Sequence, residues 1–136
     1  MTQRLYVSRP IDDRDAAEIC DIVIRARKDF RSPRFEVIDP TSIPDGGQRE
    51  NYKGLVDSQL NLMKTCDAIL IDMSLPNHTY IGCIAELVYA HTYRLCTVVY
   101  VGSNRIGHRP WLRFHADHID TTWEGAVRWI HTRLQS

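Results

Sequence analysis

The sequence predicts an α/β fold, in which helices cover both faces of a parallel sheet. Short apolar runs at residues 5–7, 35–38, 67–73 and 96–101 have the length and composition of strands. Between them, apolar residues recur at the i, i+3, i+4 spacing of helices that pack on a sheet. Strands that alternate with helices form parallel sheets with right-handed crossovers. The chain of 136 residues is long enough for a buried core, and we expect residues 1–136 to form a single domain.

The N-terminal third is interpreted as strand, helix, strand and loop. Leu5–Val7 is the first strand, after which Asp12 or Asp13 is expected to cap a helix. The positions that we expect on the inward face of this helix are Ala16, Ile19, Cys20, Val23 and Ile24. A second strand follows at 35–38. Residues 40–50 contain two prolines and two glycines and are expected to form a long loop.

The remainder of the chain adds further helices and strands. In chain order these are a helix over Asn51–Lys64, a strand over 67–73, a helix over 81–93, a strand over 96–101, a short strand near Ile119 and a helix after Thr121 or Thr122. Residues 102–117 are rich in His and Arg and are expected to be irregular. We therefore predict a flavodoxin-like, three-layer fold with a five-stranded, mostly parallel sheet in the order 2-1-3-4-5.

The charge balance argues against two classes of partner. The chain has 17 basic and 17 acidic residues and a formal net charge of zero. Nucleic acid polymers and anionic membranes attract proteins through an excess of positive charge, so we expect neither. The apolar runs are far too short to span a bilayer, and residues 1–15 show no signal-peptide pattern.

The cysteine spacing indicates free thiols. Cys20, Cys66, Cys83 and Cys96 are scattered, with no C-x-x-C pair. Buried free cysteines are common in reduced proteins. We expect a cytoplasmic protein without disulfides.

A glycine and a glutamate lie four residues apart where the third strand passes through a loop into a helix. These are Gly82 and Glu86, and in an open α/β sheet this place is the ligand crevice beyond the strand ends. Glycine permits close approach to the backbone, and a glutamate beside the apolar helix face can be a nucleophile or an acid–base group. The alternative is a carboxylate that only interacts with the positive start of the helix.

Two more residues come to the same edge of the predicted sheet. Tyr6 lies on the first strand, so its phenol can hydrogen-bond Glu86 if the first and third strands are neighbours; the alternative is a core tyrosine with a satisfied hydroxyl. Asp72 ends the third strand. Two carboxylates beside a glycosidic bond can divide attack and proton transfer between them, although Asp72 can equally cap the loop that begins at Ser74.

Other polar residues have weaker signals. Asp57 lies within a helix, where it is either solvated or a ligand contact. Asn77 and His78 precede Gly82 and can contact a ligand, although asparagine is also common in turns. Asp12, Asp13 and Arg14 either cap the helix or reach a phosphate.

A zinc site is disfavoured. His108, His115 and His118 with Asp117 invite that interpretation, but no helical pattern aligns them and no metalloprotease motif is present. The chain also lacks the glycine-rich loops of dinucleotide and triphosphate sites.

Together these residues resemble the nucleoside 2-deoxyribosyltransferase family and its N-glycoside hydrolase relatives. Leu5-Tyr6-Val7-Ser8-Arg9-Pro10 is similar to the family's I-Y-x-x-x-P strand, and residues 66–72 are similar to its x-D-hydrophobic strand. Residues 82–90, Gly-Cys-Ile-Ala-Glu-Leu-Val-Tyr-Ala, are similar to G-T-x-x-E-L-x-x-A, whose glutamate is the family nucleophile. The sequence departs from the family at Gln59, where an aspartate is common, and at Cys83.

The resemblance implies an enzyme that cleaves or transfers the N-glycosidic bond of a (deoxy)nucleoside or nucleoside monophosphate. Glu86 would attack C1′ and Tyr6 would position Glu86, with no cofactor and no metal. Ser8 and Arg9, at the matching strand end, are the candidate phosphate or sugar contacts, together with Asp57, Asn77 and Gly82.

The family also implies a homo-oligomer, a dimer or larger, in which a neighbouring subunit completes the site. Helix faces such as that around Tyr89 and Tyr93 are candidates for the contact. The alternative function is a non-catalytic module that binds or senses a nucleotide on the same fold.

Overall fold

The computed structural model describes residues 1–12, 14–42 and 52–134. Within them the strands are β1 (Gln3–Ser8), β2 (Phe35–Ile38), β3 (Ala68–Asp72), β4 (Cys96–Tyr100) and β5 (His118–Asp120). The helices are α1 (Ala16–Asp29), α2 (Tyr52–Met63), α3 (Ile81–Thr92), α4 (Pro110–His115) and α5 (Trp123–Leu134), with single 3-10 turns η1 (Pro40–Ser42) and η3 (Arg105–His108).

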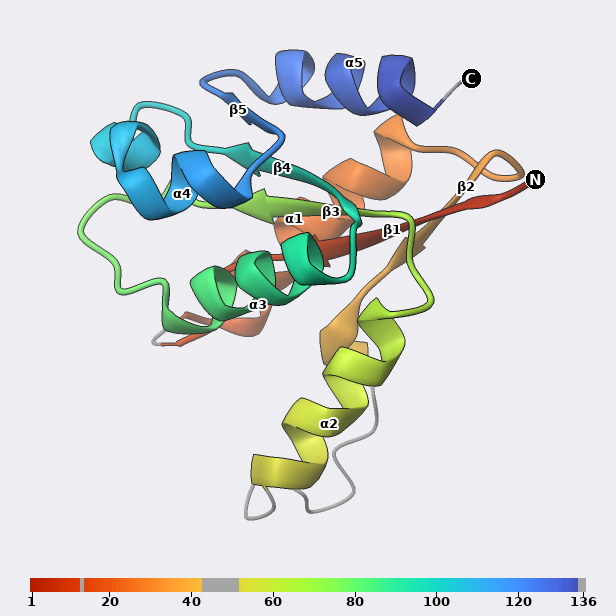
Figure 1. Cartoon of the computed structure of the whole chain (residues 1–136), viewed down its shortest axis with the longest axis horizontal. Coiled ribbons are helices and arrows are strands. Elements are labelled where there is room, and N and C mark those ends of the chain that lie inside the picture. Colours follow the sequence, from red (N-terminus) through yellow and green to blue (C-terminus); the bar gives the residue numbers. More distant parts are fainter. Residues whose placement is uncertain (13, 43–51, 135–136) are drawn as a thin grey trace.

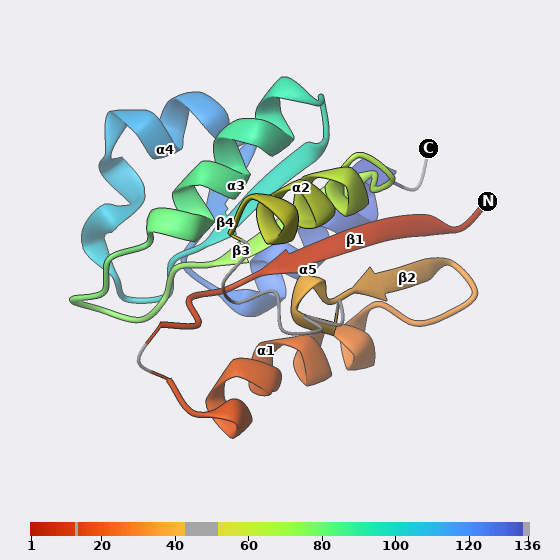
Figure 2. The ribbon, with the colours of Figure 1, turned by 90° about the horizontal axis from the view of Figure 1, so that it is seen from below.

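The sheet has the predicted strand order. It runs β2-β1-β3-β4-β5, and every neighbouring pair is parallel. The crossover helices cover both faces: α1 and α5 lie on one, and α2, α3 and α4 on the other (Figures 1 and 2). The three-layer α/β class is confirmed.

Alternation along the strands divides the core into two halves. Leu5 and Val7 of β1 face the α1/α5 layer, whereas Tyr6 faces the α2/α3 layer. The same two-residue period separates Leu70 from Ile69 in β3. β1, β3 and β4 are buried on both faces because they lie inside the sheet, which explains their continuous apolar sequences.

The start and the face of α1 differ from the prediction. The cap is Asp15, whose carboxylate accepts a hydrogen bond from the Glu18 N–H at 2.9 Å; Asp12 is exposed before the helix, and Asp13 lies outside the described residues. The buried positions are Ile22, Val23 and Ala26, while Ala16, Cys20 and Ile24 are exposed. Apolar residues on the exposed face of α1 led to a wrong prediction of its buried positions.

The segment 102–117 is more regular than predicted. It contains η3 and the six-residue helix α4. Pro110 starts α4, as proline can at a first helical position, and Leu112 and His115 are its buried residues. In the C-terminal helix α5, the Thr122 hydroxyl accepts from the Gly125 N–H at 3.0 Å, so Thr122 is the cap.

The state of the cysteines and the character of the helices were also predicted. All four cysteines are free, and only Cys20 is exposed. Among the described residues, none of the helices combines the length and the apolar character that crossing a membrane requires.

Candidate active site

The fold creates a crevice where β1 and β3 lie side by side. The chain leaves β1 towards α1 on one face of the sheet and leaves β3 towards α3 on the other. Such a switch point leaves an opening beyond the carboxyl ends of the two strands. A pocket of about 120 Å³ lies there, and its lining includes Ser8, Arg9, Gln59, His78, Gly82 and Glu86.

Glu86 places its carboxylate at the inner wall of this pocket. It lies in the second turn of α3, one residue before Leu87 on the buried stripe, so the helix start, whose effect fades within one turn, does not account for it. Ser8 Oγ, at the end of β1, donates a hydrogen bond to Glu86 Oε1 at 3.1 Å. Glu86 Oε2 is buried and has no hydrogen-bond partner among the described residues.

The surroundings of Glu86 shift its ionisation. Burial raises the pKa of the carboxyl above its usual value, and Tyr6, Ser8 and Arg9 only partly oppose that rise. A buried carboxylate oxygen without a donor is costly, because it has lost its water and gained nothing in return. One oxygen of the Glu86 carboxylate therefore lacks a hydrogen-bond donor among the described residues.

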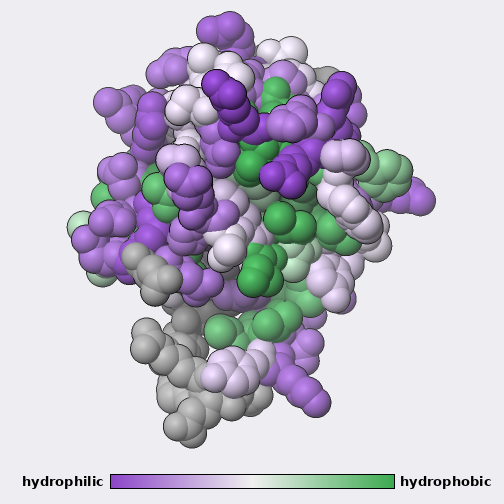
Figure 3. All heavy atoms as spheres, turned by 90° about the vertical axis from the view of Figure 1, so that its left-hand side faces the viewer, coloured by the Kyte–Doolittle hydropathy of each residue, from purple (hydrophilic) through white to green (hydrophobic). Residues whose placement is uncertain are grey.

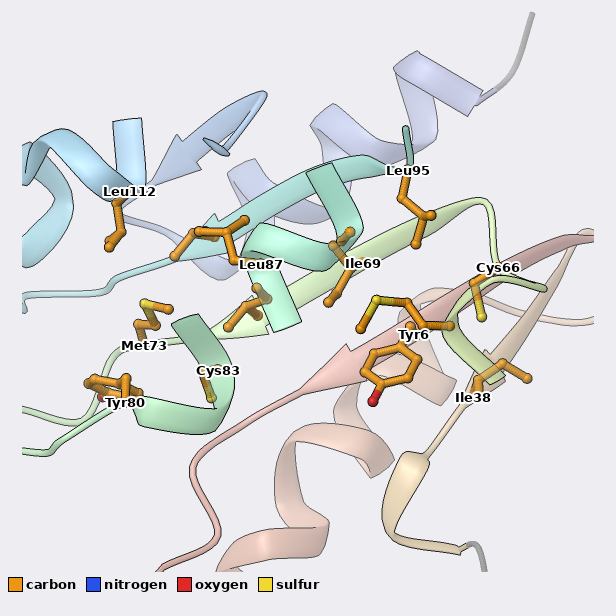
Figure 4. Packing of buried hydrophobic residues seen from close by; sticks show 14 of the residues in the cluster. Tyr6, Ile38, Cys66, Ile69, Met73, Tyr80, Cys83, Leu87, Leu95 and Leu112 are labelled. Atoms are coloured by element: carbon orange, nitrogen blue, oxygen red, sulfur yellow. The ribbon is translucent and has the colours of Figure 1, made fainter. Parts of the chain in front are cut away.

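Tyr6 lies beside Glu86, as the neighbouring strands predict. Figure 4 shows its ring on the α3 side of β1. The hydroxyl is close enough to lower the pKa of Glu86, while burial and the Glu86 charge raise the pKa of Tyr6 itself. The geometry of a hydrogen bond is not reached: within the described residues, Tyr6 Oη is buried without a partner. The satisfied core tyrosine is thus not what the structure shows.

Arg9 lines the pocket, but its guanidinium already has hydrogen-bond partners within the protein. Its side chain is 1% exposed and pairs with Asp39 Oδ1 at 2.7 Å. It also donates to the Thr41 hydroxyl at 3.1 Å and to the Ile19 carbonyl at 2.8 Å. Burial alone would raise the pKa of Asp39, but the bonds from Arg9 and Thr41 hold it below its usual value. Arg9 thus joins β1, α1 and η1 and supplies a fixed positive charge near Glu86.

Cys83 lies next to Ser8 and Glu86 without competing as a nucleophile. Burial, with help from the Glu86 and Asp72 charges, raises the pKa of its thiol to about 12. Its Sγ lies 3.5 Å from Ser8 Oγ, but a hydroxyl has a single proton, and the carboxylate is the stronger acceptor. The thiol stays protonated at neutral pH.

Asp72 and Asn77 are placed outside the pocket lining. Asp72 Oδ1 accepts from the Ser74 hydroxyl at 2.6 Å and from the Ser74 N–H at 3.0 Å, which is the loop-capping arrangement. Asn77 is exposed and has a φ of 58°, a left-handed conformation that asparagine tolerates better than most residues. The catalytic role of Asp72 and the ligand contact of Asn77 stay predictions.

The structure brings a different residue of α2 to the pocket from the one predicted, and the ligand contact of Asp57 stays a prediction. Asp57 is exposed and does not line it, whereas Gln59 does. Residues two apart on a helix lie about 200° from each other, so both cannot face the site. The useful signal was the buried Met63, one turn after Gln59. His78, singled out only together with Asn77, also lines the pocket.

Metal binding finds no support in the described ranges, where no three His, Cys, Asp or Glu side chains are grouped to hold an ion. His115 Nδ1 contacts the Trp111 carbonyl at 2.7 Å, and His118 Nε2 contacts Asp120 Oδ2 at 2.8 Å.

An apolar surface adjoins the site. Figure 3 shows hydrophobic side chains gathered on the face that carries the strand ends and the neighbouring helices. The strongly exposed members of this surface are Ile81 at the start of α3 and Trp111 and Phe114 on α4, which are 69–76% exposed. Contiguous exposed apolar surface is typical of contact with another molecule.

Solved structures provide the comparison for this architecture. The sequence matches no protein-family model and no curated protein sequence. The structure is similar to a 2-deoxyribosyltransferase from Bacillus psychrosaccharolyticus, with 13% identity, a TM-score of 0.68 and coverage of 90% of this chain and 88% of that one. The fold is that of the 2-deoxyribosyltransferases.

Two further structures support the same conclusion. A 2-deoxyribosyltransferase from Leishmania mexicana has 15% identity and a TM-score of 0.66, over 97% of this chain and 99% of that chain. A CMP N-glycosidase from Clostridium botulinum has 12% identity and a TM-score of 0.57, over 97% and 100%. The resemblance indicated by the sequence motifs is thus confirmed at the level of the fold.

Glu86→Gln should stabilise the folded chain at neutral pH. Because the pKa of Glu86 is raised on folding, wild-type stability falls as pH rises from the unfolded-state pKa through the higher folded-state pKa. Glutamine carries no charge, so the difference in unfolding free energy between Glu86→Gln and the wild type should grow across that window. It should then level off at about 1–2 kcal/mol. Urea unfolding from pH 4 to 8 measures this, with the exposed Glu124→Gln as control. A constant difference across the pH series would show that Glu86 carries no buried charge.

Gly82→Ala should separate ligand access from stability. A methyl group at Gly82 would meet no atom within 4 Å, so it would project into open space beside the pocket. Stability should stay equal or rise by up to about 1 kcal/mol, while ligand entry into the pocket is hindered. Thermal unfolding and calorimetric titration with nucleosides and nucleoside monophosphates are the measurements, and Ala85→Ser, outside the pocket lining, is the control. Unchanged binding in Gly82→Ala would remove Gly82 from the ligand contacts.

Proposed function

We propose that the chain cleaves or transfers the N-glycosidic bond of a (deoxy)nucleoside or nucleoside monophosphate, with Glu86 as the nucleophile. The observation that carries this proposal is the buried Glu86 carboxylate, which keeps one oxygen unpartnered in a pocket at the strand switch point. The fold shared with 2-deoxyribosyltransferases and a CMP N-glycosidase supports the same reaction class.

The Glu86 carboxylate is oriented before any substrate binds. Oε1 accepts the Ser8 hydroxyl at 3.1 Å, and the carboxylate that lines the pocket would attack C1′. Attack forms a glycosyl ester as the bond between C1′ and the base nitrogen breaks. Water or a second base then displaces Glu86, which regenerates the carboxylate. A side-chain nucleophile needs no cofactor.

Electrostatics around Glu86 support this role. A raised carboxyl pKa makes the ionised form a stronger nucleophile, while the positive charge of Arg9 and the hydroxyls of Ser8 and Tyr6 limit the rise. Arg9 is buried in its pair with Asp39, so its charge is fixed without any reorganisation during the reaction.

The pocket volume suits the sugar rather than the whole substrate. About 120 Å³ is below the roughly 300–1,000 Å³ of pockets that enclose complete small molecules. We place the pentose between Glu86 and Gly82, and the base towards the opening lined by His78 and Gln59.

Glu86→Gln should lower base release by at least about a thousandfold, because the attacking charge is lost while shape is kept. Tyr6→Phe should cost less than Glu86→Gln, because it removes only the nearby phenol that lowers the pKa of Glu86 and leaves the attacking carboxylate in place. A panel of nucleosides and monophosphates, assayed by chromatography for free base, gives the rates, and mass spectrometry of the wild type should detect the glycosyl ester on Glu86.

Binding separates the two candidate functions. Calorimetry should show that Glu86→Gln still binds the best substrate, because the loss is confined to the transition state. Asp72→Asn should fall between Tyr6→Phe and Glu86→Gln if Asp72 contacts the sugar. Near wild-type turnover in Glu86→Gln would refute the nucleophile, and tight binding without turnover by the wild type would favour the nucleotide-binding module.

We further propose that the chain works as a homodimer or larger assembly. Trp111 and Phe114 on α4 and the half-exposed Tyr89 on α3 are apolar surface that a second copy would cover. Helices α3 and α4 pack against each other, with Phe114 beside His91 of α3, and Tyr89 packs beside Tyr93.

Light scattering at micromolar concentration should give at least twice the mass of 15.8 kDa. Phe114→Asp should shift the chain towards the monomer, because it buries a charge in the contact. Arg128→Asp, exposed on α5 across the sheet, is the control. A monomeric wild type would overturn the assembly.

A further inference from the structure

An N-glycosidic bond breaks more easily when the departing base nitrogen gains a proton. Among the described residues, the titratable groups that line the pocket are Arg9, Asp12, His78, Tyr80, Cys83 and Glu86. Five of them do not suit the task. Arg9 is paired with Asp39, and burial raises the pKa of both Tyr80 and Cys83 to about 12. Asp12 is exposed to solvent on the chain before α1, and Glu86 is the nucleophile.

His78 is the remaining group, and its residue type fits. Histidine both gives and takes a proton near neutral pH, which makes it the commonest general acid and base. His78 is half-buried and lines the same pocket as Glu86. Its other side faces a groove that it shares with Arg109 and Trp111.

The loop that carries His78 is tied down on several sides. Asp72 Oδ1 holds Ser74 at the start of the loop. Asn104 Nδ2 donates to the Met73 carbonyl at 2.8 Å and to the Leu75 carbonyl at 3.3 Å. The Tyr80 hydroxyl also bonds the Leu75 carbonyl. A loop with this many side-chain bonds holds the residue it presents in one place.

Two features determine the position of the His78 side chain in this loop. Asn77, with its φ of 58°, turns the chain immediately before His78. The His78 ring then packs edge-on against Tyr80, with centroids 5.4 Å apart and an interplanar angle of 61°. Tyr80 is the residue that precedes α3, so this contact places His78 near the N-terminal end of the helix that carries Glu86.

We propose that His78 is the general acid for the leaving base and the general base for the acceptor, an inference that rests on the proposed function. As the Glu86 carboxylate bonds to C1′, the electron pair of the broken C1′–N bond goes to the base nitrogen, which takes a proton from the His78 imidazolium. In the second step neutral His78 removes the proton of water, or of a second base, as that acceptor bonds to C1′. The ester bond breaks, and both side chains return to their starting states.

The test compares two leaving groups. A nucleobase needs a proton to depart, whereas 4-nitrophenolate does not. His78→Gln should lower kcat/KM for the best nucleoside or nucleotide of the panel by at least about a hundredfold. The initial burst of nitrophenolate from 4-nitrophenyl β-D-ribofuranoside should change little, and the glycosyl ester should then accumulate, because the second step also lacks its base. Mass spectrometry measures that ester.

Control variants separate chemistry from folding. His78→Phe keeps a ring against Tyr80 and should reproduce His78→Gln, and circular dichroism checks that both variants fold. His108→Gln, an exposed histidine outside the pocket, should leave both rates unchanged. An equal loss with both substrates in the His78 variants would overturn the proposal, because a merely structural residue is indifferent to the leaving group.

The outcomes for Glu86 and His78 are distinguishable. If Glu86→Gln abolishes both reactions while His78→Gln leaves nucleoside cleavage intact, the proposed function stands and the His78 proposal fails. If Glu86→Gln still gives the nitrophenolate burst, the nucleophile is wrong. A wild type that releases no base from any panel member would overturn both.

Discussion

The parallel pairing of β1 with β3 is the constraint on which the site depends. These strands are separated by an entire helix–strand–helix passage, yet Ser8 lies opposite Ile71 in the register. That register brings the end of β1 level with the start of the loop that leads into α3, so Ser8 reaches Glu86 across 78 positions of sequence. Because side chains alternate along a strand, a slip of one residue would turn Tyr6 and Ser8 to the other face of the sheet. Core packing keeps Leu5 and Val7 on the α1 side of the sheet. It therefore also keeps Tyr6 and Ser8 on the side of Glu86.

The second constraint is the cost of the buried Glu86 charge. One oxygen has a single hydroxyl donor and the other has none within the described residues, so burial dominates and the pKa rises. Arg9 limits that cost at a distance, but its guanidinium is held by Asp39 and Thr41 and not by Glu86. A direct Arg9–Glu86 pair would stabilise the carboxylate and, under the proposed function, hinder its attack on C1′. Arg9 thus has two separate effects: its hydrogen bonds join three elements, and its charge acts on Glu86 without a direct bond.

Most of the fold was predictable because its signals are local. Continuous apolar runs identified β3 and β4, and the alternation of strands and helices predicted the parallel sheet and its order. The failures lie where local signals are weak. Helix α4 has six residues and begins Pro-Trp, so it offers no periodicity to detect. The face of α1 was misassigned because Ile24 is apolar and nevertheless 64% exposed. Exposed apolar residues are ordinary on folded proteins, and periodicity alone does not identify them.

The site was less predictable, since it depends on contacts between distant segments. The motif around Glu86 and the Tyr6 strand led to the crevice in which the pocket lies, but the partner of Arg9 is Asp39, a residue with no motif of its own. On α2 the choice of Asp57 followed residue type, as carboxylates attract functional interpretation, whereas the helix period favours Gln59. An amide at that position gives and accepts hydrogen bonds but has no proton to transfer near neutral pH. With Gln59 at the pocket wall and Asp57 exposed, α2 offers the pocket an amide and no carboxyl group. Under the proposed function, the proton donor would therefore come from another part of the lining, the loop between β3 and α3, where His78 lies.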